Sequence, residues 1–453
     1  MSEPSAAPLE SVLVANRGEI ARRIIRTVRR MGIRAIAVYS EADAGLPFVA
    51  EADEAVLIGP PPAARSYLDV EAVLGSARQT GAAAVHPGYG FLAENAGFAT
   101  RVIDAGLIWV GPPPAAIDQM GDKINARNLM EQAGVPVAAG SREPVADVSA
   151  AVAEAKRIGY PVMIKAAAGG GGIGMSAAAN ESELRAGFET ARSRAERFFG
   201  SSDILLERYI ERARHVEVQI LGLNDTRVLA LGERDCSVQR RHQKVAEETP
   251  SPGVTPELRA RMLAAAVRAG EAVGYRGAGT VECLVDTQAQ DFVFLEMNTR
   301  LQVEHPVTEL VTGIDLVEQQ LLIAAGGAAS FDPSSVRSDG HAVELRVYAE
   351  DPRKFLPSPG VITEWSEPSG PGVRVDAGYT EGNTVTPFYD PLLAKLCLHG
   401  ASRDEALERA RGAVAAFAIS GPKTNLPFHA ELLDSPEFSS GDYDTSVVAR
   451  LRS

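Results

Sequence analysis

The chain has 453 residues, a length that suits two to four domains. Hydrophobic residues make up 45% and charged residues 23%, as in an ordinary globular protein. The 45 lysines and arginines against 59 aspartates and glutamates give a net charge of −14, which argues against nucleic acid as a general partner.

The cysteines and the hydropathy pattern exclude several further classes of protein. Cys236, Cys283 and Cys397 lie far apart without metal-ligand spacing, so a reduced, cytoplasmic location is expected. The first ten residues have no cationic end and no apolar core, so they do not resemble a signal peptide. With no run of about 18 apolar residues, no membrane partner is expected.

Residues 11–40 show the pattern of a strand, a tight turn, a helix ended by glycine, and a second strand. This β-α-β pattern predicts a parallel sheet, and the absence of G-x-G-x-x-G argues against a dinucleotide site. Further strands containing EAVLIG and AAAVH alternate with helical stretches up to residue 110. Residues 1–115 are therefore predicted to form one α/β domain.

The loop after AAAVH contains His86, Tyr89 and Glu94. Loops at the carboxyl ends of parallel strands commonly contact ligands, but the proline and glycines here also suit a structural turn, and both interpretations stay open. Lys123 falls in the first turn of a predicted helix, where a surface lysine is the default interpretation.

A strong signal follows the apolar strand PVMIK, which ends at Lys165. The next loop holds five glycines in six positions, residues 169–174. Glycine lets backbone N–H groups approach an anion closely, and a nearby lysine adds a point charge. The spacing is not that of a P-loop. Phosphate binding by a mobile lid is favoured over a flexible linker.

Residues 203–221 have the pattern of two strands joined by a short connection. Glu207 and Tyr209 could border an adenine slot there, or the segment could be a plain crossover strand. The basic and amide-rich run from Gln239 to Lys244 indicates a local anion site or an interface. A helix is predicted over Leu258–Val273.

The segment Phe292–Pro306 alternates polar and apolar side chains. In an extended strand its polar residues would share one face: Glu296, Asn298, Arg300, Gln302 and Glu304. The other face would carry Leu295, Met297 and Leu301.

An upstream strand carries Glu282, and a turn centred on Ala289 would place Glu282 opposite Glu296, with side chains roughly 5 Å apart. Facing carboxylates repel each other, and a hard cation such as Mg²⁺ bound by Glu282, Glu296 and Asn298 would relieve that repulsion. Two solvated carboxylates on an edge hairpin are the alternative.

A polar stretch at 330–340 predicts a domain boundary. Glu344, Arg346 and Tyr348 then alternate on one face of a strand, and a β-rich region follows, closed by a helix over 403–418.

Eight motifs in this order resemble those of the biotin carboxylases of the ATP-grasp superfamily, from about residue 11 to 430: NRGEIA, HPGYGFLAEN, GDK, GGGG-x-GM, RHVE, ERDCS-x-QRRHQK, EMNTR-x-QVEHPVTE and AEDP–LPSPG. The resemblance implies an α/β and α+β fold in three parts. These are a doubly wound α/β domain (1–115), an ATP-grasp domain (116–335) whose lid spans about 137–209, and a β-rich C-terminal domain (336–453).

The resemblance implies Mg-ATP-dependent carboxylation of biotin on a carrier protein, with bicarbonate as the carbon source. The residues it implies for ATP are Lys123, Lys165, Gly171, Gly172, Glu207, Arg208, Tyr209, Ile210, His215, His242, Glu282 and Glu296. It implies Glu282, Glu296 and Asn298 as ligands of two Mg²⁺ or Mn²⁺ ions. Lys244, Arg300, Gln302 and Val303 would bind bicarbonate, and Tyr89 and Arg346 would bind biotin.

In the implied mechanism bicarbonate attacks the γ-phosphate of ATP to give carboxyphosphate. The catalytic residues would be Arg300, Glu304, Lys244 and Arg346. Glu304 would deprotonate bicarbonate, and the cations would neutralise the two anions that must meet. Arg346 would stabilise the enolate oxygen of biotin, and a closed glycine lid would exclude water.

The sequence departs from the family pattern at Ile173, where a basic residue is usual, and at Arg208, where lysine is common. It contains no M-K-M motif for biotin attachment, so a separate subunit or the amino-terminal part of a longer enzyme is expected. The partners implied are a biotin carboxyl carrier protein or domain, a carboxyltransferase subunit of an acetyl- or acyl-CoA carboxylase in fatty acid biosynthesis, and a second copy in a homodimer.

Two other functions stay open from the residues. Another ATP-grasp ligase, joining a carboxylate to an amine through an acyl phosphate, would share the glycine lid and the metal hairpin. A non-catalytic nucleotide-binding subunit is the second, although the complete set of charged residues argues against it.

Overall fold

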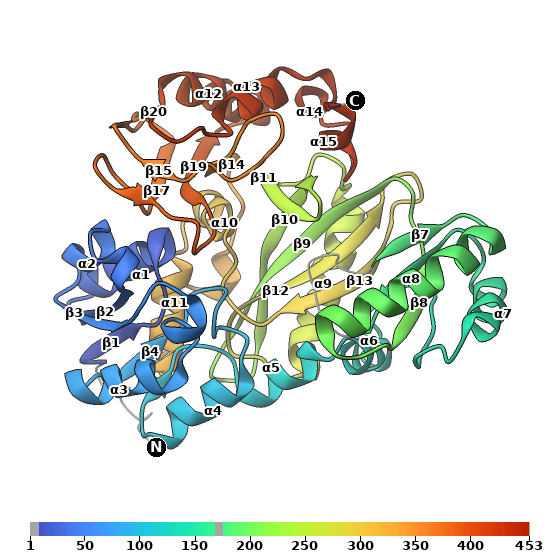
Figure 1. Ribbon diagram of the computed structural model, residues 1–453, viewed down its shortest axis with the longest axis horizontal. Coiled ribbons are helices and arrows are strands. Elements are labelled where there is room, and N and C mark those ends of the chain that lie inside the picture. The colour runs from blue at the N-terminus through green and yellow to red at the C-terminus, as the bar shows by residue number, and fades with distance from the viewer. Residues whose placement is uncertain (1–8, 168–174, 453) are drawn as a thin grey trace.

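The computed structural model describes residues 9–167 and 175–452, and Figure 1 shows its arrangement. The N-terminal part contains a five-stranded sheet in the order β3-β2-β1-β4-β5, parallel throughout. Its strands are β1 (Ser11–Val14), β2 (Arg34–Ser40), β3 (Glu54–Gly59), β4 (Ala84–His86) and β5 (Ile108–Trp109). Helices flank them: α1 (Gly18–Arg30), α2 (Pro47–Glu51), α3 (Val70–Thr80), α4 (Ala96–Asp104) and α5 (Pro114–Gly121).

The apolar runs of this part explain its parallel sheet. Val12, Leu13 and Val14 in the central strand are fully buried, as expected of strands covered by helices on both faces. The predicted α/β class is confirmed here.

A small three-stranded sheet in the order β7-β6-β8 forms the second part, shown in green in Figure 1. Its strands are β6 (Val162–Ala166), β7 (Ser176–Ala178) and β8 (Ile204–Arg208), and α7 (Val148–Ile158) and α8 (Glu181–Phe199) pack on it. Lys165 stands on β6 as predicted. The glycine loop between β6 and β7, with Gly171, Gly172 and Ile173, lies outside the described residues.

An eight-stranded antiparallel sheet forms the centre, in the order β13-β12-β9-β10-β11-β14-β19-β17. Its strands are β9 (Ala213–Gly222), β10 (Val228–Arg240), β11 (Gln243–Thr249), β12 (Gly277–Asp286), β13 (Asp291–Asn298), β14 (His341–Tyr348), β17 (Val373–Ala377) and β19 (Leu392–Gly400). Because β11 pairs with β14, residues on both sides of the predicted boundary at 335 share one sheet.

The remaining elements cover this sheet or extend it. The helices are α6 (Lys123–Gln132), α9 (Pro256–Ala272), α10 (His305–Thr312), α11 (Leu316–Ala324), α12 (Arg403–Ala416), α13 (Leu426–Asp434), α14 (Pro436–Ser440) and α15 (Val447–Arg450). Short strands pair as β15 (Gly360–Val361) with β18 (Thr384–Val385) and β16 (Glu364–Ser366) with β20 (Ala418–Ser420). Among the described residues, no helix has the length and apolar character needed to cross a membrane.

The prediction that Phe292–Glu304 form one long strand of alternating polar and apolar residues is wrong beyond Asn298. β13 ends there, and after a short loop Glu304 occupies the N-cap position of α10. This helix has proline in its first turn. A bulge also shifts the register between Glu282 and Cys283, which leaves Leu295 as an extra residue. Leu295 consequently lies on the same cavity as Glu296, not on the opposite face.

A buried carboxylate joins the central sheet to the C-terminal helices. Glu248 on β11 is fully buried and contacts Arg403 Nε at 2.7 Å, His341 Nε2 at 2.7 Å and the Tyr443 hydroxyl at 2.6 Å. Burial alone would raise the pKa of Glu248, but His341 and Arg403 lower it to about 2.

We expect Glu248→Gln to lower the free energy of unfolding by about 3 kcal/mol at pH 7. Because the folded pKa lies below the unfolded one, the stabilisation by Glu248 is complete above about pH 4.5 and is lost as the pH falls towards 2. Urea unfolding of both proteins across this pH range measures the difference. Glu71→Gln, at an exposed side chain, is the control, and a difference that does not shrink in acid would contradict the assignment.

Candidate active site

A cavity of about 740 Å³ lies between the N-terminal sheet, the small sheet and the central sheet. Fourteen of the predicted site residues line it: Tyr89, Lys123, Lys165, Glu207, His215, His242, Lys244, Glu282, Glu296, Asn298, Arg300, Gln302, Val303 and Arg346. The fold therefore gathers into one place side chains that lie up to 257 positions apart, from Tyr89 to Arg346.

The two facing carboxylates of the hairpin are arranged as predicted. Glu282 on β12 and Glu296 on β13 are directly opposite in the antiparallel register. The Glu282 carboxylate accepts from Lys244 Nζ at 2.8 Å and Asn298 Nδ2 at 2.7 Å, and it pairs with His215 Nε2 at 2.8 Å.

The two carboxylates differ in their electrostatic surroundings. Burial would raise the pKa of Glu282, but Lys244 and His215 hold it well below its ordinary value. Burial and the neighbouring Glu282 raise the pKa of Glu296. Among the described residues the Glu296 side chain has no partner within hydrogen-bond or ion-pair distance, although Lys123 lies near enough to oppose the rise of its pKa, so its oxygens are available to a cation from the cavity.

Lys244 on β11 lies at the centre of three carboxylates. Its ammonium is 2.6 Å from Glu217, 2.8 Å from Glu282 and 2.7 Å from Glu304. Burial lowers the pKa of Lys244, but the three carboxylates outweigh it and raise the pKa well above its ordinary value. Lys244 therefore stays charged. It holds β9, β11, β12 and the start of α10 around one point.

Beneath Lys244, the sequence interpretation missed a second buried cation, Arg234 on β10. Its guanidinium is fully buried, pairs with Glu217 at 2.6 Å and donates to Gln219 at 2.7 Å and Thr308 at 2.9 Å. A sequence signal for a buried polar partner was present, because His215, Glu217 and Gln219 alternate with apolar residues along β9.

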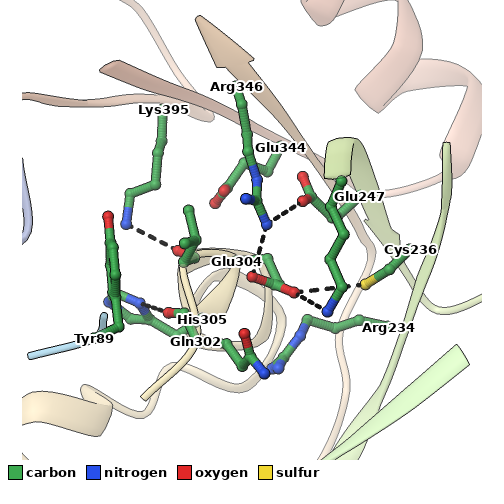
Figure 2. Close-up of polar contacts among 12 residues, drawn as sticks. Tyr89, Arg234, Cys236, Glu247, Gln302, Glu304, His305, Glu344, Arg346 and Lys395 are labelled. Atoms are coloured by element: carbon green, nitrogen blue, oxygen red, sulfur yellow. Dashed lines mark hydrogen bonds and ion pairs between the residues drawn. The ribbon is translucent and has the colours of Figure 1, made fainter. Parts of the chain in front are cut away.

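Glu304 is fully buried and does not line the cavity itself. Its two oxygens lie 2.7 Å from Lys244 and 2.9 Å from Arg346. Figure 2 shows the contact between Glu304 and Arg346. Burial would raise the pKa of Glu304, but Lys244, Arg346 and Arg234 hold it well below its ordinary value.

Arg346 also pairs with Glu247 on β11 at 2.6 Å, a contact that the sequence interpretation missed. Burial raises the pKa of Glu247 to about 7, and Arg346 opposes that rise.

Arg300 lies in the loop between β13 and α10. Its Nε donates to Glu94 at 2.9 Å, and the Thr299 N–H donates to the same carboxylate at 3.1 Å. Its two Nη groups donate to the side-chain oxygens of Gln302 and Asn298, both at 3.2 Å. Glu94 of the N-terminal part thus orients the arginine that faces the cavity.

Two lysines and residues of the β8 strand also line the cavity. Lys123 stands in the first turn of α6, and burial lowers its pKa. Lys165 on β6 is hydrogen-bonded to Glu207 on β8. Arg208, Tyr209 and Ile210 do not line the cavity. The Arg208 N–H donates to Ala139 and the Tyr209 N–H to Pro161, so both are already used within the fold.

Three family descriptions together match most of the chain. Residues 8–117 match the biotin carboxylase N-terminal domain, and residues 344–450 match the biotin carboxylase C-terminal domain. Between them, residues 122–330 match the ATP-binding domain of the carbamoyl-phosphate synthase L chain.

Known proteins resemble the chain over nearly its whole length. Biotin carboxylase 2 of Bacillus subtilis is 51% identical over 437 residues, covering 96% of this chain and 98% of that protein. The propionyl-CoA carboxylase alpha chain of Ruegeria pomeroyi is 47% identical over 97% of this chain and 67% of its own.

Solved structures agree in fold. A biotin carboxylase–βγ-ATP complex from Campylobacter jejuni has a TM-score of 0.95 at 43% identity, covering 98% of this chain and 99% of that one. The biotin carboxylase domain dimer of the Hydrogenobacter thermophilus 2-oxoglutarate carboxylase, solved with MgADP and bicarbonate, has a TM-score of 0.93 at 43% identity, covering 97% of each chain. The predicted three-part fold class is confirmed, and the chain belongs to the biotin carboxylase family.

Proposed function

We propose that this biotin carboxylase uses Mg-ATP and bicarbonate to carboxylate biotin on a carrier protein, through carboxyphosphate, as the first half-reaction of an acyl-CoA carboxylase. The observation that carries the proposal is the position of Glu304, which lies between Lys244 and Arg346 beside the Glu282–Glu296 pair. The carboxylate of Glu304, which can accept a proton, is thereby held beside two cationic side chains and the proposed metal site, all at one side of the cavity.

The donor set of Glu282, Glu296 and Asn298 fits a hard cation. Mg²⁺ and Mn²⁺ prefer such oxygen ligands, and the unpartnered Glu296 supplies an anionic oxygen on the cavity side. We assign two ions to this site, on the family pattern. When bound, the ions supply positive charge for the ATP phosphates.

The nucleotide would lie between this hairpin and the small sheet. Lys123 and Lys165 line the cavity and provide positive charge for its phosphates, with Lys123 on the Glu296 side. Glu207, beside Lys165, borders the adenine end, and His215 and His242 line the same space. Since the Arg208 and Tyr209 N–H groups are already bonded, Ile210 has the backbone N–H that remains for the base. Gly171 and Gly172 are proposed phosphate contacts in the undescribed loop.

Bicarbonate would bind against Arg300, Lys244, Gln302 and the Val303 backbone. Arg300 is already oriented by Glu94, so it can present its planar guanidinium to the anion with little reorganisation. Lys244 is shared among three carboxylates, and an incoming anion competes for its ammonium.

That competition explains how Glu304 can act as a base although its pKa is held low. Any loss of contact with Lys244 raises the pKa of Glu304 towards the range in which it accepts a proton. Bicarbonate binding therefore activates the base that deprotonates it. Once protonated, Glu304 holds Arg346 less strongly.

Arg346, then held by Glu247 alone, can stabilise the enolate oxygen of biotin, with Tyr89 beside the ring. The ion pairs therefore determine the order of the proposed steps. Proton transfer to Glu304 comes first, and only then is Arg346 free of Glu304 and able to face biotin.

The acceptor and the partners are proposed from the relatives and not from the site. The relatives include the propionyl-CoA carboxylase alpha chain and a pyruvate carboxylase component of Methanothermobacter thermautotrophicus, so the family serves several acceptors. We propose a carboxyltransferase for an acyl-CoA, a biotinyl carrier and a homodimer like that of the Hydrogenobacter thermophilus domain. A cytoplasmic location and the domain boundaries at 115 and 335 also remain predictions.

The proposed reaction predicts that ADP release from ATP rises when free biotin and bicarbonate are both present. Glu304→Gln should lower kcat by about 10²- to 10⁴-fold, because the base is lost, and leave the KM for ATP within about twofold. A coupled ADP assay measures both, with Glu71→Gln as control. Unchanged turnover in Glu304→Gln, or no response of the wild type to biotin, would favour an acyl-phosphate ligase instead.

The metal assignment predicts that Glu296→Gln raises the Mg²⁺ concentration for half-maximal activity by about tenfold, since an anionic ligand becomes neutral. Chelation should abolish ADP release, and added Mn²⁺ should restore it. Asp291→Asn, at an exposed carboxylate on the same hairpin, is the matched control and should leave the Mg²⁺ dependence unchanged. Equal Mg²⁺ dependence in both variants would refute the assignment.

A further inference from the structure

Lys395 on β19 is a charged side chain for which the proposed mechanism has no role. Its relative exposure is 0%, and a lysine is rarely buried to this extent without a specific partner. Its ammonium donates to the Val303 carbonyl at 2.9 Å and lies 3.1 Å from Glu19 and 3.9 Å from Asp376. Figure 2 shows Lys395 reaching towards the loop that precedes Glu304.

The strand register places Lys395 beside a proposed catalytic cation. Lys395 is the cross-strand partner of Arg346 on β14, so both side chains leave the same face of the sheet. Arg346 contacts the Glu304 carboxylate, and Lys395 contacts the carbonyl of the preceding residue. Two neighbouring cations therefore hold consecutive residues of one loop.

The peptide geometry shows what this contact controls. In a trans peptide the C=O and the following N–H point in opposite directions. His305 Nδ1 lies 2.8 Å from the Gln302 carbonyl, and Lys395 holds the next carbonyl, that of Val303. The two contacts together set the planes of both peptides, and hence the direction of the Val303 N–H and the place from which the Glu304 side chain starts.

The same ammonium links this loop to the N-terminal part of the molecule. Glu19, in the first turn of α1, pairs with Lys395 through one oxygen and accepts the Tyr89 hydroxyl with the other. Tyr89 lines the cavity, and its hydroxyl end lies on the Lys395 side of the loop (Figure 2). A short chain of contacts thus runs from Val303 through Lys395 and Glu19 to Tyr89.

We propose that Lys395 is a positioning residue for the bicarbonate site, which fixes the Val303–Glu304 peptide and, through Glu19, couples it to Tyr89. This inference rests on the proposed function, because it assumes that the Val303 loop binds bicarbonate. Lys395 does not contact the cavity, so its effect on the reaction passes through the backbone that it holds.

The test is a comparison of steady-state constants for Lys395→Met, which keeps the length of the side chain but removes its donor. We expect the KM for bicarbonate to rise by about tenfold or more and the KM for ATP to stay within about twofold. Glu19→Gln keeps an oxygen for Tyr89 but turns the charge-assisted contact with Lys395 into a neutral one, and we expect a rise of about threefold in the bicarbonate KM.

Arg403→Met is the matched control, since it also removes a cation from a buried carboxylate, Glu248, but at a residue that does not line the cavity. It should lower the thermal midpoint and leave the KM for bicarbonate unchanged, which separates positioning from general stability. If Lys395→Met does not fold, Glu19→Gln decides the question.

A bicarbonate KM within twofold of the wild type in the folded Lys395 and Glu19 variants would overturn the proposal. A wild-type protein without biotin- and bicarbonate-dependent ADP release would instead overturn the proposed function, and this inference with it.

Discussion

The site depends on one lysine that is surrounded by carboxylates. Lys244 lies within 2.8 Å of Glu217, Glu282 and Glu304, which come from two strands and the start of a helix. Without that ammonium, three buried carboxylates would lose the one cation that they share, and among the described residues each would keep only a single ion-pair partner, Arg234, His215 or Arg346. The cation therefore assembles the site and also leaves it with little spare positive charge.

Because the cations around Lys244 are already paired, the binding of another anion would change the existing pairs. Arg234 neutralises Glu217 from below, and Arg346 shares Glu304 with Lys244. In the proposed mechanism, an additional anion draws on Lys244 as well as on Arg300, which weakens the hold on Glu304 and makes that carboxylate more basic. The binding of an anion is thereby coupled, in this mechanism, to the acceptance of a proton by Glu304.

The three parts of the molecule meet through ion pairs and through strand pairing. Glu94 of the N-terminal part orients Arg300 of the central part, and Glu19 pairs with Lys395 of the C-terminal part. The central sheet continues through the pairing of β11 with β14. Residues that act together are therefore held by contacts between parts as well as within them.

Much of this site could be predicted because strands impose a two-residue period. The opposition of Glu282 and Glu296 followed from two apolar strands and a short turn, and the register confirms it. The same period failed after Asn298, where the chain leaves the sheet to enter α10, and at the bulge beside Leu295. The two-residue period predicts which side chains share one face of a strand. It does not predict where the strand ends or where a bulge interrupts the pairing.

The buried partners were beyond sequence reasoning for a different reason. Glu247 and Arg346 pair across β11 and β14, and Lys395 meets Glu19 from the other end of the chain. Such pairs depend on which strands become neighbours, and no local pattern encodes that choice. Motif resemblance named fourteen of the residues that line the cavity, whereas the supporting charges became visible only in the fold.

The central claim is that this charge network brings bicarbonate to the γ-phosphate of ATP. The most direct measurement is the transfer of label from ¹⁸O-bicarbonate into inorganic phosphate during biotin-dependent turnover, followed by mass spectrometry. Attack by a bicarbonate oxygen predicts one labelled oxygen in each phosphate released. Phosphate that carries no label would contradict the account, because water and not bicarbonate would then be the nucleophile.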